Sequence, residues 1–176
     1  MALDDARERA RRVRMVVFDV DGVLTDGSLF FGDDGQEYKA FNSLDGHGMK
    51  MLKSTGVELA IITGRTSQVV VHRALNLGIT HLYQGADNKQ IAFAELLEKS
   101  GLRAEAVAYV GDDVVDLPIM VRCGLAITVP AAPPLVKTHA HYVTTREGGR
   151  GAAREVCELV MDAQGTLAPH LSGYLD

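Results

Sequence analysis

Short, continuous apolar runs alternate with helical patterns along most of this chain. The strand-like runs lie at residues 15–18, 57–62, 79–83, 106–110, 125–128 and 141–144. Helical patterns fill the intervals at residues 48–54, 67–77, 89–99, 116–121 and 135–138, and a longer one covers 151–163. This alternation predicts an α/β fold, with a parallel sheet between helices on both faces. In such open sheets a ligand lies beyond the carboxyl ends of the strands, where the strand order reverses.

Length and composition narrow the class of protein. The 176 residues are expected to form one domain over 1–176, large enough to bury a core without disulfides. The net charge of −5 argues against a nucleic-acid partner, and no stretch is long enough to span a membrane. Residues 1–14 mix arginines with acidic side chains, which predicts a solvated helix and not a signal peptide. Cys123 and Cys157 have no metal-ligand spacing, so we expect reduced thiols and a cytoplasmic protein.

Residues 28–41 interrupt the alternation. Their sequence, SLFFGDDGQEYKAF, has two short strand-like arms around an Asp-Asp-Gly turn, which predicts a β-hairpin. It is too short to be a cap domain, and it should overhang the loop at residues 19–27, DVDGVLTDG, which directly precedes it. Aromatic side chains are costly to expose on a two-stranded ribbon, and this one carries Phe30, Phe31, Tyr38 and Phe41. We therefore expect hairpins from several subunits to pack together, with packing onto its own domain as the alternative.

Two aspartates, Asp19 and Asp21, follow the first apolar run in the segment VVFDVDGVLTDG. Side chains two residues apart on a strand share a face, so both carboxylates can enter one small volume. They cannot both ionise cheaply, so either a cation neutralises one or one keeps its proton. A metal site with one aspartate as nucleophile and the other as general acid meets both conditions, whereas a simple Asx-type turn explains only one aspartate well. A calcium loop is excluded, because its required bidentate glutamate would fall on Phe30.

Other strand ends carry polar groups suited to the same site. Thr63 follows the second strand and can donate a hydrogen bond to a phosphate. Lys89 lies where a helix begins, and it adds positive charge at a favourable anion site. Asp112, Asp113 and Asp116 follow a further strand, and clustered carboxylates suit Mg²⁺. Asp113 and Asp116 would hold water at the ion or orient Lys89.

Together these groups predict phosphoryl transfer. Asp19 would attack phosphorus and form an aspartyl-phosphate, while Mg²⁺ and Lys89 offset charge on the phosphoryl oxygens. Asp21 would protonate the leaving alkoxide and then take a proton from the water that hydrolyses the intermediate. Asp112 would bind the metal together with Asp19 and the backbone carbonyl of Asp21.

The segments DVDGVLTDG, IITGR, NK and GDDVVD, in this order and at these strand ends, resemble the four motifs of the haloacid dehalogenase (HAD) superfamily. Four longer segments closely resemble the capless 3-deoxy-D-manno-octulosonate 8-phosphate (KDO 8-P) phosphatases: FNSLDGHGMKML, ITHLYQGADNKQIAF, VAYVGDDVVDLPIM and GGRGAAREVCELVM. The resemblance covers nearly the whole chain. It implies a HAD-like Rossmannoid three-layer fold in which the hairpin at 28–41 replaces a cap domain. Residues 146–176 would form a glycine-rich stretch, a C-terminal helix and a tail.

The resemblance also implies an activity, which is Mg²⁺-dependent hydrolysis of KDO 8-P to KDO and phosphate in lipopolysaccharide precursor synthesis. The partner is then a small-molecule sugar phosphate, with no nucleic acid and no membrane. The resemblance also implies a homotetramer, in which a neighbouring subunit's hairpin and the glycine-rich region complete each active site. The positions that match the family near its substrate are Thr25, Asp45, Gly46, Arg65, Lys89 and Arg150.

Three alternatives stay open. A phosphatase for a related nonulosonate 9-phosphate would have the same catalytic core. A phosphoacceptor signalling domain would hold a long-lived aspartyl-phosphate, but the carboxylate of Asp21 argues against it because it would speed dephosphorylation. A non-catalytic assembly module would be a stable tetramer that is inactive on every sugar phosphate.

His139 and His141 have no carboxylate at ligand spacing, so they are expected in a loop or an edge strand.

Overall fold

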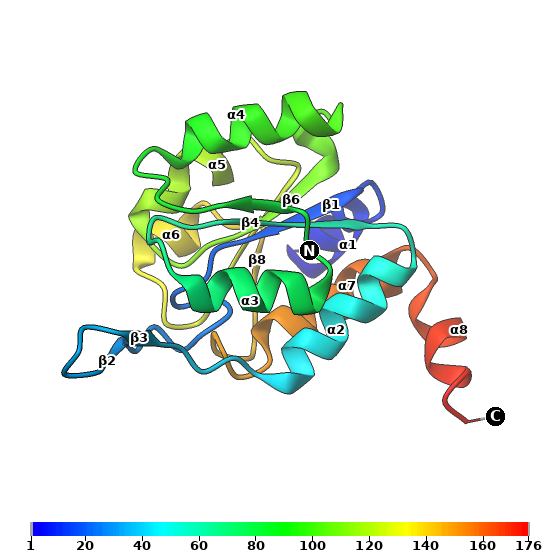
Figure 1. The fold of residues 1–176 in the computed structure, drawn as a ribbon. Helices are drawn as coiled ribbons and strands as arrows, with labels where there is room; N and C mark the ends of the chain where they lie inside the picture. The colour runs from blue at the N-terminus through cyan, green and yellow to red at the C-terminus, as the bar shows by residue number, and fades with distance from the viewer. Residues whose placement is uncertain (1, 176) are drawn as a thin grey trace.

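The computed structural model describes residues 2–175, and it has the predicted α/β architecture (Figure 1). Six parallel strands form one sheet in the order β5-β4-β1-β6-β7-β8. Their bounds are β1 Met15–Phe18, β4 Glu58–Ile62, β5 His81–Tyr83, β6 Val107–Val110, β7 Leu125–Thr128 and β8 Tyr142–Val143. All six predicted strands are confirmed, although four of them are shorter than the apolar runs that contain them. The chain leaves β1 toward β4 and later returns on its other side as β6, so the order reverses at β1.

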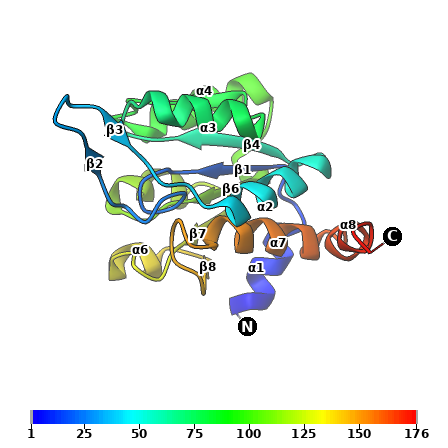
Figure 2. The same cartoon turned by 60° about the horizontal axis from the view of Figure 1, so that its bottom comes forward.

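Helices cover both faces of the sheet and give three layers (Figure 2). The helices that pack on one face are α1 Ala2–Ala10, α2 Ser43–Ser54, α3 Gln68–Leu77 and α7 Ala152–Ala163. Those on the other face are α4 Lys89–Ser100, α5 Leu117–Met120 and α6 Pro134–Thr138. Two 3₁₀ turns, Ala104–Ala106 and Val114–Asp116, flank β6, and α8 Leu167–Ser172 follows α7. In the part of the chain that is described, no helix combines the length and apolar character needed to cross a membrane.

The position of β1 at the centre of the sheet explains why its sequence is apolar without interruption. Val16 and Phe18 face the core under α2 and α7, whereas Met15 and Val17 face the core under α4 and α5. All four side chains are fully buried. A strand covered on both faces has no polar side, so its residues cannot alternate in polarity.

Helix α2 begins five residues before the predicted start at position 48. The side chain of Asn42 accepts hydrogen bonds from the backbone N–H groups of Leu44 and Asp45, and so caps the helix. Gly46 and Gly48, which weaken the helical pattern in the sequence, lie within this first part of the helix. The early start matters because it brings the N-terminus of α2 to the carboxyl edge of the sheet.

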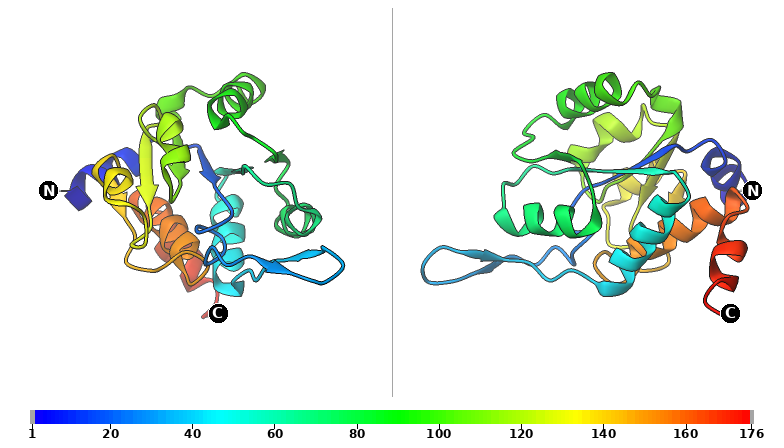
Figure 3. Two further views of the ribbon diagram at one scale, coloured as in Figure 1. Left: turned by 90° about the vertical axis from the view of Figure 1, so that its left-hand side faces the viewer. Right: turned by 45° about the vertical axis from the view of Figure 1, so that its right-hand side comes forward.

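The predicted hairpin is confirmed as an antiparallel pair, β2 Phe30–Phe31 and β3 Glu37–Tyr38. Its tip extends beyond the body of the molecule in two views (Figure 3), so only the base of the hairpin lies near the aspartate loop. The aromatic side chains on the ribbon stay more than half exposed: Phe30 is 55%, Phe31 59% and Tyr38 55% accessible. Phe41 instead is partly buried against the core of its own domain, so the alternative expectation holds for Phe41 and not for the other three aromatic residues.

Candidate active site

A pocket of about 350 Å³ opens at the carboxyl edge of the sheet. Its lining comes from four strand ends and consists of Asp19, Asp21, Gly27, Thr63, Gly64, Arg65, Lys89, Asp112, Asp113 and Val115. The register places these groups together: Phe18 at the end of β1 pairs with Ile61 of β4 and with Val110 of β6. Asp19 therefore leaves the sheet level with the ends of both neighbouring strands, at the point where the strand order reverses.

A buried lysine connects two of the acidic groups. Lys89 Nζ lies 2.6 Å from Asp19 Oδ2 and 2.7 Å from Asp116 Oδ1, and all three side chains are buried. Lys89 is the first residue of α4, which Asn88 caps by accepting a hydrogen bond from the backbone N–H of Gln90 at 3.0 Å. Burial alone would lower the pKa of Lys89, but the two carboxylates raise it above its usual value. The ammonium therefore stays charged in the pocket.

The acidic cluster is costly without a cation. Burial and the Asp116 carboxylate raise the pKa of Asp19 to about 6, although Lys89 opposes this shift. Burial, together with Asp19 and Asp116, raises the pKa of Asp112 to about 7. Carboxylate oxygens of Asp19, Asp112 and Asp116 all lie within 4.8 Å of one another. Hard oxygen ligands with raised pKa values form a donor set that suits a divalent cation such as Mg²⁺.

Asp116 is held by groups from its own loop and strand. Its Oδ1 accepts a hydrogen bond from Tyr109 Oη at 2.6 Å as well as from Lys89. Its Oδ2 accepts from the backbone N–H groups of Asp112 and Asp113 at 2.9 and 3.1 Å. Of the two roles expected for Asp116, this geometry favours orienting Lys89 over holding water. Tyr109 was missed in the sequence because it lies inside a core strand and resembles an ordinary buried aromatic residue.

A second lysine, also missed in the sequence, lies beside Asp21. Lys39 Nζ is 2.5 Å from Asp21 Oδ1 and 2.6 Å from Glu37 Oε1. Arg65, on the far side of Glu37, is 3.4 Å from the same Glu37 oxygen. Within a polar hairpin arm, a Glu-x-Lys pattern normally indicates a solvated surface. The spacing of two, which puts Glu37 and Lys39 on one side of the arm, was the signal available.

The aspartate loop is packed against the glycine-rich stretch. A Cβ atom on Gly148 would lie 1.8 Å from the carbonyl oxygen of Gly22, so only glycine fits there. Gly149 has a φ of +66°, and its backbone N–H donates to the carbonyl of Val23 at 2.9 Å. The glycines of this stretch thus allow two backbones to meet directly and fix the loop that carries the two aspartates.

The positions expected near substrate separate into two groups, one at the pocket and one away from it. Arg65 lines the pocket, and Arg150 lies beside it in an adjoining hollow, 3.4 Å from Asp26. Asp45 instead accepts hydrogen bonds from the backbone N–H groups of Gly151 and Arg154, at 3.3 and 2.8 Å.

The other two positions of this set also lie outside the pocket lining. The Thr25 hydroxyl contacts the backbone of its own loop. Gly46 lies on α2 close to Arg73, whose guanidinium a Cβ atom there would approach to 2.3 Å. Of this set, the pocket lining therefore includes Arg65 and Lys89, whereas Thr25, Asp45 and Gly46 lie outside it.

His139 and His141, which are separated by one residue, lie in a loop and beside an edge strand. His141 Nδ1 accepts a hydrogen bond from the backbone N–H of Ala126, and His139 lies 2.9 Å from the carbonyl of Leu135. His47 lies 3.1 Å from the hydroxyl of Tyr174. None of these three histidines lines the pocket.

A doubly covered parallel sheet with aspartates at the ends of β1 and β6 and a lysine at the start of α4 defines a haloacid dehalogenase-like hydrolase. The sequence profile of the haloacid dehalogenase-like hydrolases matches residues 31–124. The chain is 51% identical over 163 residues to the 3-deoxy-D-manno-octulosonate 8-phosphate phosphatase KdsC of Escherichia coli K12, covering 93% of this chain and 87% of that protein. It therefore belongs to the KDO 8-phosphate phosphatase family within these hydrolases.

Solved structures agree with this assignment. A probable YrbI family phosphatase from Pseudomonas syringae superposes with a TM-score of 0.97 at 50% identity, covering 98% of each chain. A KDO 8-phosphate phosphatase from Moraxella catarrhalis, solved in complex with a magnesium ion, a phosphate ion and KDO, superposes with a TM-score of 0.95. That structure is 40% identical and covers 97% of this chain and 98% of its own.

Proposed function

We propose that this chain hydrolyses KDO 8-phosphate to KDO and inorganic phosphate in a Mg²⁺-dependent reaction. The observation that carries the proposal is the buried Lys89, held between Asp19 and Asp116 in a pocket that Asp21, Thr63 and further acidic groups also line. The identity to KdsC proteins over nearly the whole chain supports the choice of substrate. Residues 1–176 would act as a single phosphatase domain.

Each group has a separate part in the reaction. Asp19 attacks phosphorus to form an aspartyl-phosphate, and Lys89, with Thr63 donating from the end of the neighbouring strand β4, offsets charge on the phosphoryl oxygens. Asp21 gives its proton to the leaving alkoxide and later takes one from the attacking water. Asp19, Asp112 and the backbone carbonyl of Asp21 would hold Mg²⁺, which supplies positive charge against the phosphoryl group. Asp113, whose side chain accepts from the backbone N–H of Val114 at 2.7 Å, would support this loop.

Specificity for the sugar would come from the rim of the pocket. Arg65 and Arg150 present guanidinium groups on two sides of the site, and guanidinium recognises carboxylate and phosphate well. Thr25, Asp45 and Gly46 would act on substrate indirectly, by fixing the loop and the helix ends that surround it.

We place the enzyme in the cytoplasm as a homotetramer with active sites at subunit interfaces. Support for assembly comes from the exposed aromatic residues of the hairpin, which a neighbouring subunit would cover. Sedimentation of the wild type and of Phe31→Asp tests this: a tetramer should shift to smaller species in the variant. A monomeric wild type would contradict the proposal.

The activity is tested by phosphate release from purified protein. KDO 8-phosphate should be turned over with Mg²⁺ and not with EDTA, and Asp19→Asn should abolish turnover. A clear preference for a nonulosonate 9-phosphate would assign the chain to the related sugar. Stable phosphorylation without turnover would indicate a phosphoacceptor domain, and a stable tetramer without either property would indicate an assembly module.

A further inference from the structure

Lys39 is buried at the base of an otherwise exposed hairpin. Its side chain is only 1% accessible, although Tyr38 beside it is 55% accessible. A lysine is rarely buried unless its ammonium is paired, and this one is paired twice, with Asp21 at 2.5 Å and Glu37 at 2.6 Å. The hairpin therefore brings two charged side chains, Glu37 and Lys39, to the edge of the site and leaves its aromatic side chains exposed.

The two catalytic aspartates each have their own lysine. Lys89 contacts Asp19, and Lys39 contacts Asp21. Lys39 does not line the pocket, so it is placed to act on Asp21 and not on the phosphoryl group. Within residues 2–175, the hydrogen bond from Lys39 to Oδ1 is the one that holds the Asp21 carboxylate.

Asp21 needs such a partner because the position of its backbone does not by itself set the direction of its carboxyl group. It follows β1 by three residues and lies in the loop, outside the hydrogen-bond ladder of the sheet. An acid that transfers a proton must lie within hydrogen-bond reach of the leaving oxygen. A carboxylate held through one oxygen can present the other to the pocket in a defined direction.

The ammonium is itself held in place. Glu37 accepts from Lys39 and lies 3.4 Å from Arg65, and Lys39 with Arg65 holds the pKa of Glu37 below its usual range, although burial opposes this. The alternating charges of Arg65, Glu37, Lys39 and Asp21 join two loops of the site to the base of the hairpin. Strands β2 and β3 pair at only two positions, so the hairpin holds its shape weakly by itself. The chain of ion pairs therefore anchors the base of the hairpin to the site.

We infer that Lys39 is a positioning residue that orients the carboxyl group of Asp21, which gives a proton to the leaving oxygen as the acid and takes one from water as the carboxylate. The inference rests on the phosphatase activity proposed above. It adds a residue from the hairpin to the catalytic machinery, and it gives the hairpin a function within its own subunit in addition to any role in assembly.

The test compares Lys39→Met with wild type on two aryl phosphates that carry no carboxylate. Phenolate needs a proton to leave, whereas p-nitrophenolate leaves readily without one. We expect kcat/KM to fall roughly 10- to 100-fold on phenyl phosphate and less than about threefold on p-nitrophenyl phosphate. Lys39→Arg preserves the charge and the donors, so its loss on phenyl phosphate should be smaller than that of Lys39→Met. If Lys39→Met does not fold, Lys39→Arg is compared with wild type, and its smaller loss should again be confined to phenyl phosphate.

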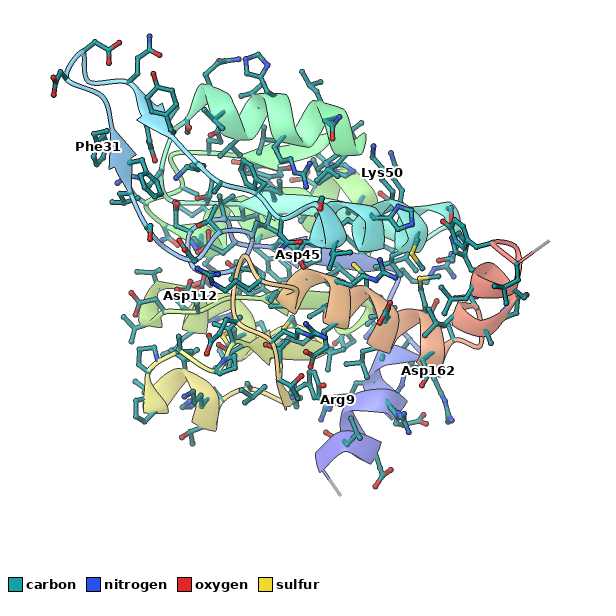
Figure 4. The ribbon with its side chains drawn as sticks, turned by 90° about the horizontal axis from the view of Figure 1, so that it is seen from below. Arg9, Phe31, Asp45, Lys50, Asp112 and Asp162 are labelled. Carbon is teal, nitrogen blue, oxygen red and sulfur yellow. The ribbon has the colours of Figure 1, made fainter. Side chains whose placement is uncertain are left out.

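Matched controls separate this role from a general effect on folding. Lys50→Met removes an exposed lysine of α2 that lies away from Asp112 (Figure 4), and it should leave both rates unchanged. Calorimetric Mg²⁺ affinity should not fall in Lys39→Met, because Lys39 contacts the side chain of Asp21 and none of the oxygens proposed to hold the ion. Equal losses on both substrates, or no loss on either, would overturn the inference. Absence of phosphate release by the wild type would instead refute the proposed function.

Discussion

Replacing Lys89 with methionine should separate the charge of this residue from its packing. Methionine fills much of the volume of the lysine stem but lacks the ammonium, so Asp19 and Asp116 would be left as buried like charges. Removing one partner of a buried ion pair costs about 3–5 kcal/mol, and here one ammonium serves two carboxylates. The backbone N–H groups and Tyr109 that still bind Asp116 should keep the loss within this range.

The loss should depend on pH in a definite direction. In the wild type, burial raises the pKa of Asp19 to about 6 in spite of Lys89, so removing the ammonium raises this pKa further. An acid whose pKa is higher in the folded state stabilises the fold as the pH falls, because the folded state binds the proton more tightly. The penalty of Lys89→Met should therefore be largest near about pH 8 and shrink toward about pH 5.

Urea denaturation in EDTA, at a series of pH values, measures this penalty directly. Lys99→Met is the matched control, because Lys99 lies on the same helix with a side chain 63% accessible, and it should cost less than about 0.5 kcal/mol. The double variant Lys89→Met/Asp116→Asn should regain part of the lost stability. A penalty below about 1 kcal/mol at about pH 8, or one that does not change with pH, would refute the assignment of Lys89 as the counterion of this cluster.

Three further outcomes follow from other contacts. Because burial and neighbouring carboxylates raise the pKa of Asp112 to about 7, the rise in Tm that Mg²⁺ produces over EDTA should grow from about pH 6 to about pH 8, and Asp112→Asn should flatten this dependence. Gly148→Ala, whose Cβ would meet the Gly22 carbonyl at 1.8 Å, should cost about 1–3 kcal/mol and more than tenfold in kcat/KM, whereas Gly173→Ala should be tolerated; equal effects of the two would contradict the backbone packing. Asp45→Asn preserves an acceptor for the N-terminus of α7 and should cost less than about 1 kcal/mol in thermal denaturation, while Asp45→Ala should cost about 1–3 kcal/mol; equal losses in the two variants would show that the charge of Asp45 matters more than its acceptor oxygens.

Much of the fold could be predicted because each strand carries its own signal. A strand covered on both faces must be apolar throughout, so β1, β6 and β7 stand out from their neighbours without knowledge of the pairing. Boundaries were less accurate where a side chain decides them, as at α2, whose start depends on the Asn42 cap. The order of the strands is not encoded locally, because it depends on which runs pair across the sheet.

The candidate site also contains residues that could be selected from the sequence and residues that could not. Asp19, Asp21, Lys89 and Asp112 could be selected from the sequence because each follows an apolar strand or begins a helix, and the carboxyl ends of parallel strands meet at one edge. Lys39 and Tyr109 could not, because one resembles a solvated hairpin lysine and the other a core aromatic residue. Their roles depend on distances to Asp21 and Asp116 that only the packed chain defines.

The sequence by itself therefore determined the kind of chemistry, through residue types placed at strand ends. Tertiary structure decided which carboxylate receives which cation, since Lys89 and Lys39 reach their aspartates across 70 and 18 residues of chain. It also decided that Asp45 caps α7 and that Gly148 packs against the aspartate loop. Charge pairing in a buried site is strong only when the charged groups lie a few ångströms apart. Residues distant in the sequence come that close only when the strands are paired in their native register.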